Sequence, residues 1–198
     1  MLELNKGTQL AGRYSLVRRL GGSGRTEVWL ATDRMTKASV ALKIAADADG
    51  ARLRSEWQSG IRLVHPHIVR AFEYHAEPEL ALYSQQFIDG PDISVLAGSA
   101  VPNILGAVGL LLDAVAYLHG RDIVHRDIKG SNVLLDSNGA PYLSDFGTAA
   151  AVGAAASATS PVAESPQSLA GEAVSTADDI FALGTLVYEL ISGRPPWS

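Results

Sequence analysis

The stretch that decides the fold spans residues 125–132 and reads HRDIKGSN. It places Asp127, Lys129 and Asn132 close together in the chain, and apolar residues flank it on both sides. A solvated surface loop has no need of such apolar flanks. The pattern therefore predicts a polar loop that is attached to a core, as a catalytic site requires.

Two further patterns accompany this loop, and the second of them suits a phosphate site. Asp145-Phe146-Gly147 follows Asn132 after a short β-like run, and a glycine-rich turn at Gly21–Gly24 lies between two β-like runs. Glycines let backbone N–H groups approach phosphate oxygens, although this turn alone would also suit an ordinary hairpin. Lys43 ends a third apolar run. It is either a surface lysine or a buried charge, and Glu56 on the next predicted helix is its candidate partner.

Taken together, these motifs resemble those of the eukaryotic-type (Hanks-type) serine/threonine protein kinases, and they are most similar to those of the bacterial members. The resemblance runs from about residue 12 to the last residue. It implies an α+β, two-lobed fold, with an antiparallel sheet and one helix in the N-terminal lobe and a mostly helical C-terminal lobe. We expect an N-terminal extension over residues 1–12, an ATP-binding lobe over 13–88 and a catalytic lobe over 89–198.

The resemblance implies a role for each matching residue in phosphoryl transfer from ATP. Asp127 would orient or accept the proton of the substrate hydroxyl, and Lys129 would lie near the γ-phosphate. Asn132 and Asp145 would bind Mg²⁺ through oxygen atoms. Lys43 would bind the α- and β-phosphates. The remaining expected nucleotide-site residues are Gly21, Gly22, Ser23, Gly24, Val28, Ala41, Glu56 as the partner of Lys43, Gln86 and Ile88 of the hinge, and Gln85 as gatekeeper.

Three residues near these motifs have expected supporting roles. Asp179 would be the buried anchor of the catalytic loop, and His125 would be structural rather than a general base. Arg126 precedes the catalytic aspartate, as in kinases whose activation loop is controlled by phosphorylation, because an arginine can bind an added phosphate. Candidate acceptors for autophosphorylation in the alanine-rich segment are Ser157, Thr159 and Ser160.

The chain departs from the family pattern at several positions. Ser23 and Thr26 stand where glycines are usual, and Gln167 replaces a glutamate that normally forms an ion pair. The family continues for several helices beyond Gly193-Arg-Pro-Pro. We therefore expect an incomplete C-terminal lobe with exposed apolar surface on the helix that carries Asp179. These departures leave one alternative open, a pseudokinase or truncated nucleotide-binding scaffold that regulates a partner.

Composition narrows the class of protein. The net charge is −5, which argues against a nucleic-acid binder. None of the 198 residues is a cysteine, which excludes disulfides and cysteine–zinc sites. The longest apolar run, 104–112, is shorter than the roughly 18 residues that a membrane span needs. We expect a cytoplasmic enzyme that acts on serine and threonine hydroxyls of proteins in signalling.

Periodicity predicts the remaining elements. β-like runs are expected near 14–20, 27–31, 39–44, 68–74, 80–88, 133–135 and 142–144, and helices at 51–64 and 177–192. A long buried helix should present one apolar face, which consists of Leu105, Val108, Leu112, Val115 and Leu118. Residues 149–163 are expected to form a loop.

Overall fold

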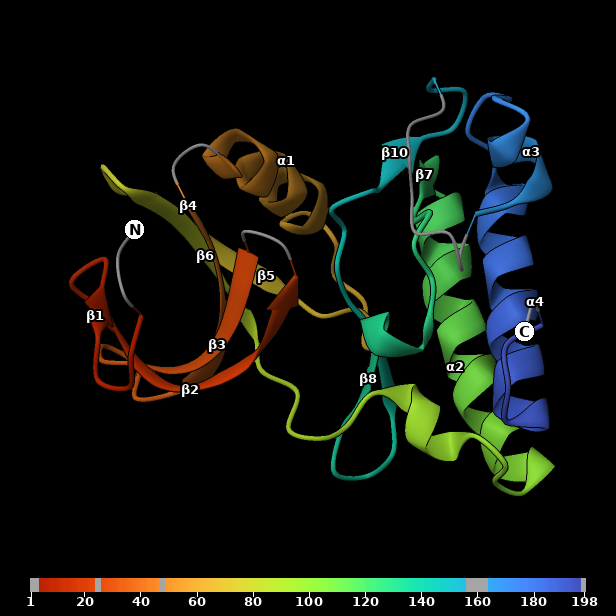
Figure 1. Cartoon of the computed structure of the whole chain (residues 1–198), viewed down its shortest axis with the longest axis horizontal. Coiled ribbons are helices and arrows are strands. Elements are labelled where there is room, and N and C mark those ends of the chain that lie inside the picture. The colour runs from red at the N-terminus through yellow and green to blue at the C-terminus, as the bar shows by residue number, and fades with distance from the viewer. Residues whose placement is uncertain (1–3, 24–25, 47–48, 156–163, 197–198) are drawn as a thin grey trace. The chain divides into compact units, whose positions relative to one another are not determined.

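The computed structural model describes residues 4–23, 26–46, 49–155 and 164–196. The chain divides into two compact units, of which the first is Met1–Leu63 with Val69–Phe87 and the second is Val64–Ile68 with Ile88–Ser198 (Figure 1). The expected lobes were continuous in sequence, whereas residues 64–68 belong to the second unit. These residues pair with β9 (Pro141–Leu143) of the second unit, where the Leu143 N–H donates to the His67 carbonyl at 2.9 Å.

A curled antiparallel sheet and one helix make up the first unit (Figure 1). The six strands pair in the order β1-β2-β3-β4-β6-β5. This confirms the expected sheet-plus-helix class. The elements are β1 (Gln9–Leu10), β2 (Tyr14–Ser23), β3 (Thr26–Asp33), β4 (Ser39–Ala46), α1 (Gly50–Gly60), β5 (Ala71–Ala76) and β6 (Leu80–Gln86).

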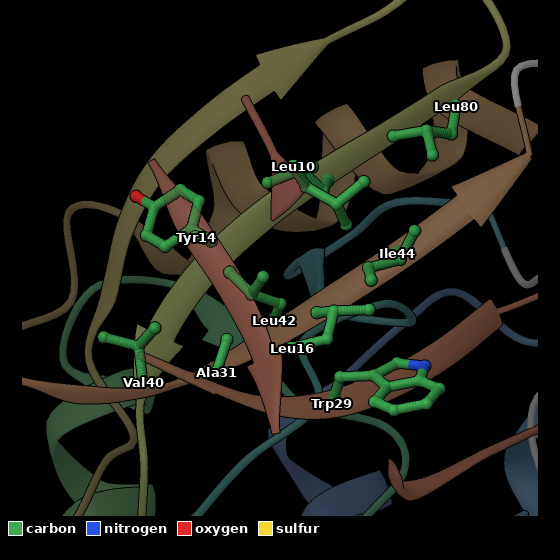
Figure 2. Close-up of a cluster of buried hydrophobic side chains, with 10 residues drawn as sticks. Leu10, Tyr14, Leu16, Trp29, Ala31, Val40, Leu42, Ile44 and Leu80 are labelled. Atoms are coloured by element: carbon green, nitrogen blue, oxygen red, sulfur yellow. The ribbon is translucent and has the colours of Figure 1, made fainter. Parts of the chain in front are cut away.

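Strand alternation gives this sheet two different faces. Val40, Leu42 and Ile44 of β4 point to one face, where they join a buried cluster with Leu80 and Leu82 of β6 (Figure 2). Because successive strand residues point to opposite faces, the residues between them point the other way. Lys43 and Ala45 are thereby directed to the face that α1 covers.

Helix α1 packs on this second face through a smaller apolar cluster. The cluster consists of Ala45, Leu53, Ala81 and Tyr83. The helix was expected to run to residue 64, but it ends at Gly60, and the Ile61 N–H closes the last turn on the Trp57 carbonyl at 2.8 Å. The helix does not continue to residue 64 because residues 64–68 belong to the second unit.

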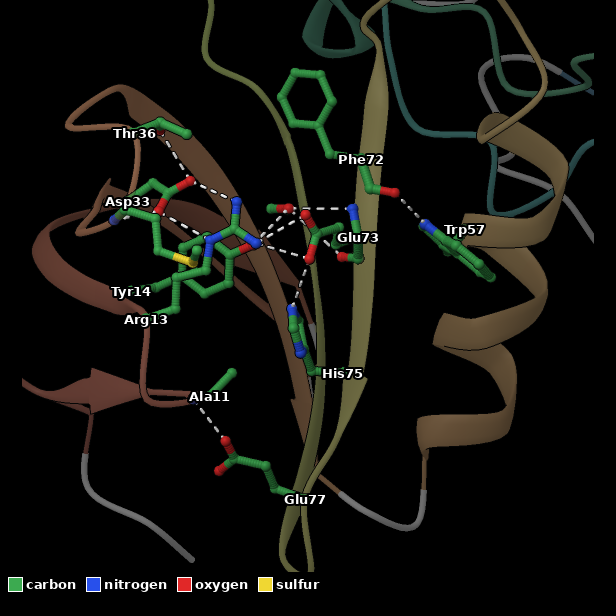
Figure 3. Close-up of polar contacts among 12 residues, drawn as sticks. Ala11, Arg13, Tyr14, Asp33, Thr36, Trp57, Phe72, Glu73, His75 and Glu77 are labelled. Carbon is green, nitrogen blue, oxygen red and sulfur yellow. Dashed lines mark hydrogen bonds and ion pairs between the residues drawn. The ribbon is translucent and has the colours of Figure 1, made fainter.

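Part of the predicted N-terminal extension, Gln9–Leu10, belongs to the sheet. Strand β1 pairs with β2. Arg13 then donates two hydrogen bonds to Asp33, at 2.9 and 2.7 Å, and also binds Glu73 (Figure 3). Asp33 is buried, and its hydrogen bonds to Arg13 hold the pKa of its carboxyl well below the usual range. This partly buried ion pair joins the start of β2 to the end of β3.

Helices dominate the second unit, as expected for the catalytic lobe. Two long helices, α2 (Val101–His119) and α4 (Thr176–Ser192), pack against each other, and α2 also packs on β9. The short elements are η2 (Ile93–Leu96), β7 (Ile123–Val124), η3 (Gly130–Asn132), β8 (Val133–Leu135), β9 (Pro141–Leu143), β10 (Ala150–Ala151) and α3 (Pro166–Leu169). Strand β8 pairs with β9, and β7 pairs with β10.

The buried face of α2 differs from the one that periodicity predicted. Leu105 and Leu112 are 54% and 47% exposed. The residues that pack inward are Ile104, Ala107, Val108, Leu111, Ala114, Val115 and Leu118. The prediction was wrong at these two positions because α2 is apolar on nearly all sides, so that the pattern could not single out one face.

The apolar character of α2 also bears on membranes. Within the described residues, α2 is the one helix long and apolar enough to cross a membrane, with a mean hydropathy of 1.7. Core helices of water-soluble domains pass the same test, and α2 packs on α4 and β9, so the finding is weak evidence for a span. On α4, Ile180, Tyr188 and Ile191 are exposed, which is the apolar surface expected on the helix that carries Asp179.

Candidate active site

The glycine-rich turn connects β2 to β3 in the first unit. Gly22 has a φ of +137°, and a Cβ at this position would collide with the carbonyl oxygen of Thr26. The requirement for glycine therefore falls on Gly22. Ser23 and Thr26 lie opposite each other as strand residues. Gly24 lies outside the described residues.

Strand pairing places the next predicted site residues beside this turn. Gly21 lies opposite Val28 on β3, and Val28 lies opposite Lys43 on β4. Directly opposite residues of antiparallel strands share a face of the sheet. The first unit thus aligns the glycine turn, Val28 and Lys43 across three neighbouring strands.

Lys43 and Glu56 form the predicted ion pair. The Lys43 Nζ lies 2.6 Å from the Glu56 Oε1, and the two side chains are 13% and 6% exposed. The reading of Lys43 as a surface residue is therefore wrong. The Tyr83 hydroxyl donates to the same Glu56 oxygen, also at 2.6 Å. Burial makes this carboxylate dependent on its donors, because an unpaired buried charge is costly.

The predicted hinge begins at the end of β6. Gln85 lies opposite Ala41, and Gln86 donates its backbone N–H to the Arg70 carbonyl at 2.8 Å. Ile88 is buried and is the first residue of the second unit after Phe87. The proposed hinge therefore coincides with the change of unit along the chain.

The catalytic loop of the second unit gathers its polar side chains around Asp127. Lys129 Nζ donates to both carboxylate oxygens of Asp127, at 2.8 and 3.1 Å. Asn132 Nδ2 donates to the Asp127 carbonyl at 2.8 Å and to Oδ2 at 2.9 Å. A carboxylate has about four lone-pair sites, and the described residues use three of them. Asp127 can therefore still accept a hydrogen bond from a substrate hydroxyl.

Asp179 anchors this loop from the N-terminal turn of α4, as predicted. Its fully buried carboxylate accepts the backbone N–H groups of His125 and Arg126, at 2.9 and 2.8 Å. His119 Nε2 lies 2.8 Å from the same carboxylate. Arg126 has a φ of +69°, a strained conformation that these hydrogen bonds stabilise.

His125 is fully buried and has structural contacts. Its Nε2 lies 3.0 Å from the Ser144 carbonyl, and its ring packs edge-on against Phe146 at 4.9 Å between centroids. The Asp127 N–H donates to the other ring nitrogen at 3.3 Å. Both nitrogens are therefore engaged with the backbone, which agrees with the prediction that His125 is not the general base.

Two side chains whose oxygen atoms would suit a divalent cation flank the β8–β9 pair. The Ser144 N–H donates to the Asn132 carbonyl at 2.9 Å, which brings Asn132 next to the start of the Asp145-Phe146-Gly147 motif. Asn132 uses its amide nitrogen on Asp127, so its Oδ1 is the atom suited to a cation. Asp145 adds a carboxylate on a left-handed residue, at φ +65°. An amide oxygen and a carboxylate fit Mg²⁺, which takes few protein ligands and completes its shell with phosphate and water.

Comparison with known proteins agrees with this arrangement. The family model described as "Protein kinase domain" matches residues 14–198. The chain belongs to the protein kinase family. The match includes both units, and it accounts for the sheet with one helix, the catalytic loop and the Asp145 motif within one ordered set.

Similar kinases come from several bacteria. The DNA damage-responsive serine/threonine-protein kinase RqkA of Deinococcus radiodurans is 32% identical over 99% of this chain, and PrkC of Bacillus subtilis is 32% identical over 96%. PknB of Mycobacterium tuberculosis is 31% identical over 96%. The matched regions make up 32% of the first two relatives and 34% of the third, so the chain spans about a third of their length.

The segment between the Asp145 motif and α3, which contains the alanine-rich stretch, is described only at its two ends. Ser157, Thr159 and Ser160 lie outside the described residues, so their role as acceptors stays a prediction. Where the segment resumes, the Ser165 hydroxyl donates to the buried Asp178 carboxylate of α4. Ser165 also accepts the Ser168 N–H at 3.0 Å and so caps α3.

Sequence reasoning missed Tyr83 and the contact between His119 and Asp179. Both depend on partners far along the chain, since Tyr83 lies 27 residues from Glu56 and His119 lies 60 from Asp179. One signal was present for Tyr83, because alternation along 80–86 puts it on the face opposite to Leu82. Nothing in the sequence pattern marked His119.

Proposed function

We propose that this chain is the catalytic part of a Mg-ATP-dependent serine/threonine protein kinase. The observation that carries the proposal is the Asp127 carboxylate, which Lys129 and Asn132 both contact while one acceptor site is left for a hydroxyl. The bacterial relatives named above are serine/threonine kinases by name, and they share the family of this chain.

The proposed reaction transfers the γ-phosphoryl group of ATP to a protein hydroxyl. The hydroxyl oxygen attacks the γ-phosphorus, and the bond from that phosphorus to the bridging oxygen breaks. The electron pair of that bond leaves with ADP, while the hydroxyl proton passes to the Asp127 carboxylate. Lys129 stabilises negative charge on the transferred group from its position beside Asp127.

Positioning and charge neutralisation supply most of the catalysis in such a transfer. In the first unit, Lys43 would bind the α- and β-phosphates while Glu56 keeps its ammonium group in place. Asn132 and Asp145 would hold Mg²⁺, whose contribution when bound is to neutralise charge on the phosphate oxygens. The glycine turn would contribute backbone N–H groups to the phosphates.

The described residues give the pseudokinase alternative no support. It was motivated by Ser23, Thr26 and Gln167 and by the expected incomplete C-terminal lobe, and among the described residues of the glycine turn the positive φ falls on Gly22. The charged pairs that kinases require, Lys43–Glu56 and Lys129–Asp127, are both formed. We therefore propose an active enzyme.

Substrates and location are also proposals. We propose proteins as substrates, and the chain itself among them through Ser157, Thr159 or Ser160, with Arg126 as a candidate partner of the added phosphate. We place the reaction in the cytoplasm, where ATP is available. Nucleic-acid substrates are not expected at a net charge of −5.

The test is the intact mass of the purified chain after incubation with Mg-ATP. We expect added phosphoryl groups on the wild type and none on Asp127→Asn, whose amide retains one acceptor oxygen but is not basic. The variant should be folded, which a urea unfolding curve will show. An unmodified wild type, or equal modification of both proteins, would overturn the proposal.

A further inference from the structure

The Glu56 carboxylate accepts two different donors at one oxygen. Lys43 Nζ and the Tyr83 hydroxyl each lie 2.6 Å from Oε1. One carboxylate oxygen can accept both, since it has two lone pairs. The lysine donor is charged and the tyrosine donor is neutral. A phosphate that approaches Lys43 therefore attracts the lysine donor but not the tyrosine donor.

Strand register explains why these groups meet. Lys43 on β4 lies directly opposite Tyr83 on β6, and both point to the face that α1 covers. Glu56 lies one helical turn after Leu53, which packs into the apolar cluster beside Tyr83. The carboxylate is therefore fixed at the edge of an apolar cluster, where water is largely excluded and each donor counts.

We infer that Tyr83 is a positioning residue, whose hydroxyl holds the Glu56 carboxylate and thereby leaves Lys43 available to the nucleotide phosphates. The inference rests on the proposed function. Tyr83 is fixed on a buried strand, and its neutral hydroxyl is not drawn to a phosphate. Its hydrogen bond to Glu56 therefore persists when Lys43 turns some of its N–H groups toward the phosphates.

Without this hydroxyl, the buried carboxylate relies more heavily on Lys43. The attraction between Glu56 and Lys43 then competes directly with the attraction between the phosphates and Lys43. Binding of a phosphorylated nucleotide should weaken, whereas binding of the nucleoside alone should not change. If the Tyr83 hydroxyl had only a structural role, its removal would change the binding of both ligands equally or of neither.

The experiment compares Tyr83→Phe with Tyr14→Phe in the full chain. Tyr14 is a matched control, because its hydroxyl is also buried in the same sheet but donates to the neutral Ser84 at 3.1 Å. Dissociation constants for Mg-ADP and for adenosine are measured by calorimetric titration for each protein. A double variant with Glu56→Gln shows whether the effect passes through Glu56.

For Tyr83→Phe we expect Mg-ADP binding about ten-fold weaker, which corresponds to one hydrogen bond to a charged group. Adenosine binding should stay within about two-fold. Tyr14→Phe should bind Mg-ADP like the wild type, and Tyr83→Phe should add little once Glu56→Gln is present.

Three results would overturn the inference. One is an unchanged Mg-ADP constant in Tyr83→Phe, and another is an equal loss for Mg-ADP and adenosine, which would indicate general damage to the unit. Both leave the proposed function intact, because the wild type still binds nucleotide. The third is a wild type that binds no Mg-ADP, which would overturn the proposed function and the inference together.

Discussion

An Asp179→Asn substitution removes one of the two acceptor oxygens that hold the catalytic loop. In the wild type, Oδ2 accepts the His125 N–H and lies 2.8 Å from His119 Nε2, while Oδ1 accepts the Arg126 N–H. An asparagine has one oxygen and one NH₂ group. Whichever way its amide turns, an NH₂ group faces a backbone N–H, and that donor loses its acceptor.

The expected cost follows from burial. Asp179 is 0% exposed, so water cannot replace the missing acceptor. A hydrogen bond to a charged group contributes about 1.5–3 kcal/mol, and an unsatisfied buried donor costs about 1–3 kcal/mol. Taking the lower part of each range, we expect the free energy of unfolding to fall by about 3 kcal/mol, a large share of the roughly 5–15 kcal/mol typical of a domain.

Urea denaturation measures this change through the midpoint and slope of the unfolding curve. Asp113→Asn is the matched control, since this carboxylate lies on α2, is 71% exposed and lies 3.3 Å from His65. The control should stay within about 0.5 kcal/mol of the wild type. A loss below about 1 kcal/mol for Asp179→Asn, or a loss equal to that of the control, would refute the reasoning.

Three further substitutions test separate contacts. Hydrogen bonds from Arg13 lower the pKa of the Asp33 carboxyl in the folded state. The Asp33 carboxylate therefore contributes its full stabilisation above about pH 4, the usual pKa of an unfolded aspartate. That contribution is lost as the pH falls from there toward the lowered pKa of the folded state. The urea midpoints of the wild type and Asp33→Asn should therefore converge between pH 6 and 2.5, and parallel curves would contradict this. Gly130→Ala places a methyl against the Ser94 hydroxyl and should lower the free energy of unfolding in urea by about 1–3 kcal/mol. A second substitution, Ser94→Ala, should recover part of that loss. An unchanged urea midpoint in Gly130→Ala would disprove the contact. Gly22→Ala should cost about 1–3 kcal/mol in the same assay, whereas Gly21→Ala, whose added Cβ meets nothing within 4 Å, is the control and should cost less.

Much of the site follows from the sequence because its chemistry is local. Asp127, Lys129 and Asn132 lie within one short loop, so the sequence alone already brings these three side chains close together. The strands of the first unit could also be predicted, since alternation marks β4 and β6. Their ends were less certain, and β6 stops at Gln86 instead of residue 88.

The faces of the long helices could not be predicted in the same way. On α2 nearly every side is apolar, and only the packing against α4 and β9 decided that Ile104 is buried while Leu105 is exposed. The glycine turn shows the same limit, because alignment by spacing placed the important glycines at Ser23 and Thr26. Among the described residues of the turn, the backbone instead gives the positive φ to Gly22.

The sequence by itself determined the family, the sheet-plus-helix and helical parts, and the residues that carry the proposed chemistry. These follow from residue types and short spacings, which neighbouring positions impose directly. Only the tertiary structure decided that Tyr83 shares an oxygen of Glu56 with Lys43, and that His119 and two backbone N–H groups meet at Asp179. Such contacts depend on strand register and helix packing, and both are settled by the burial of the whole unit rather than by any local pattern.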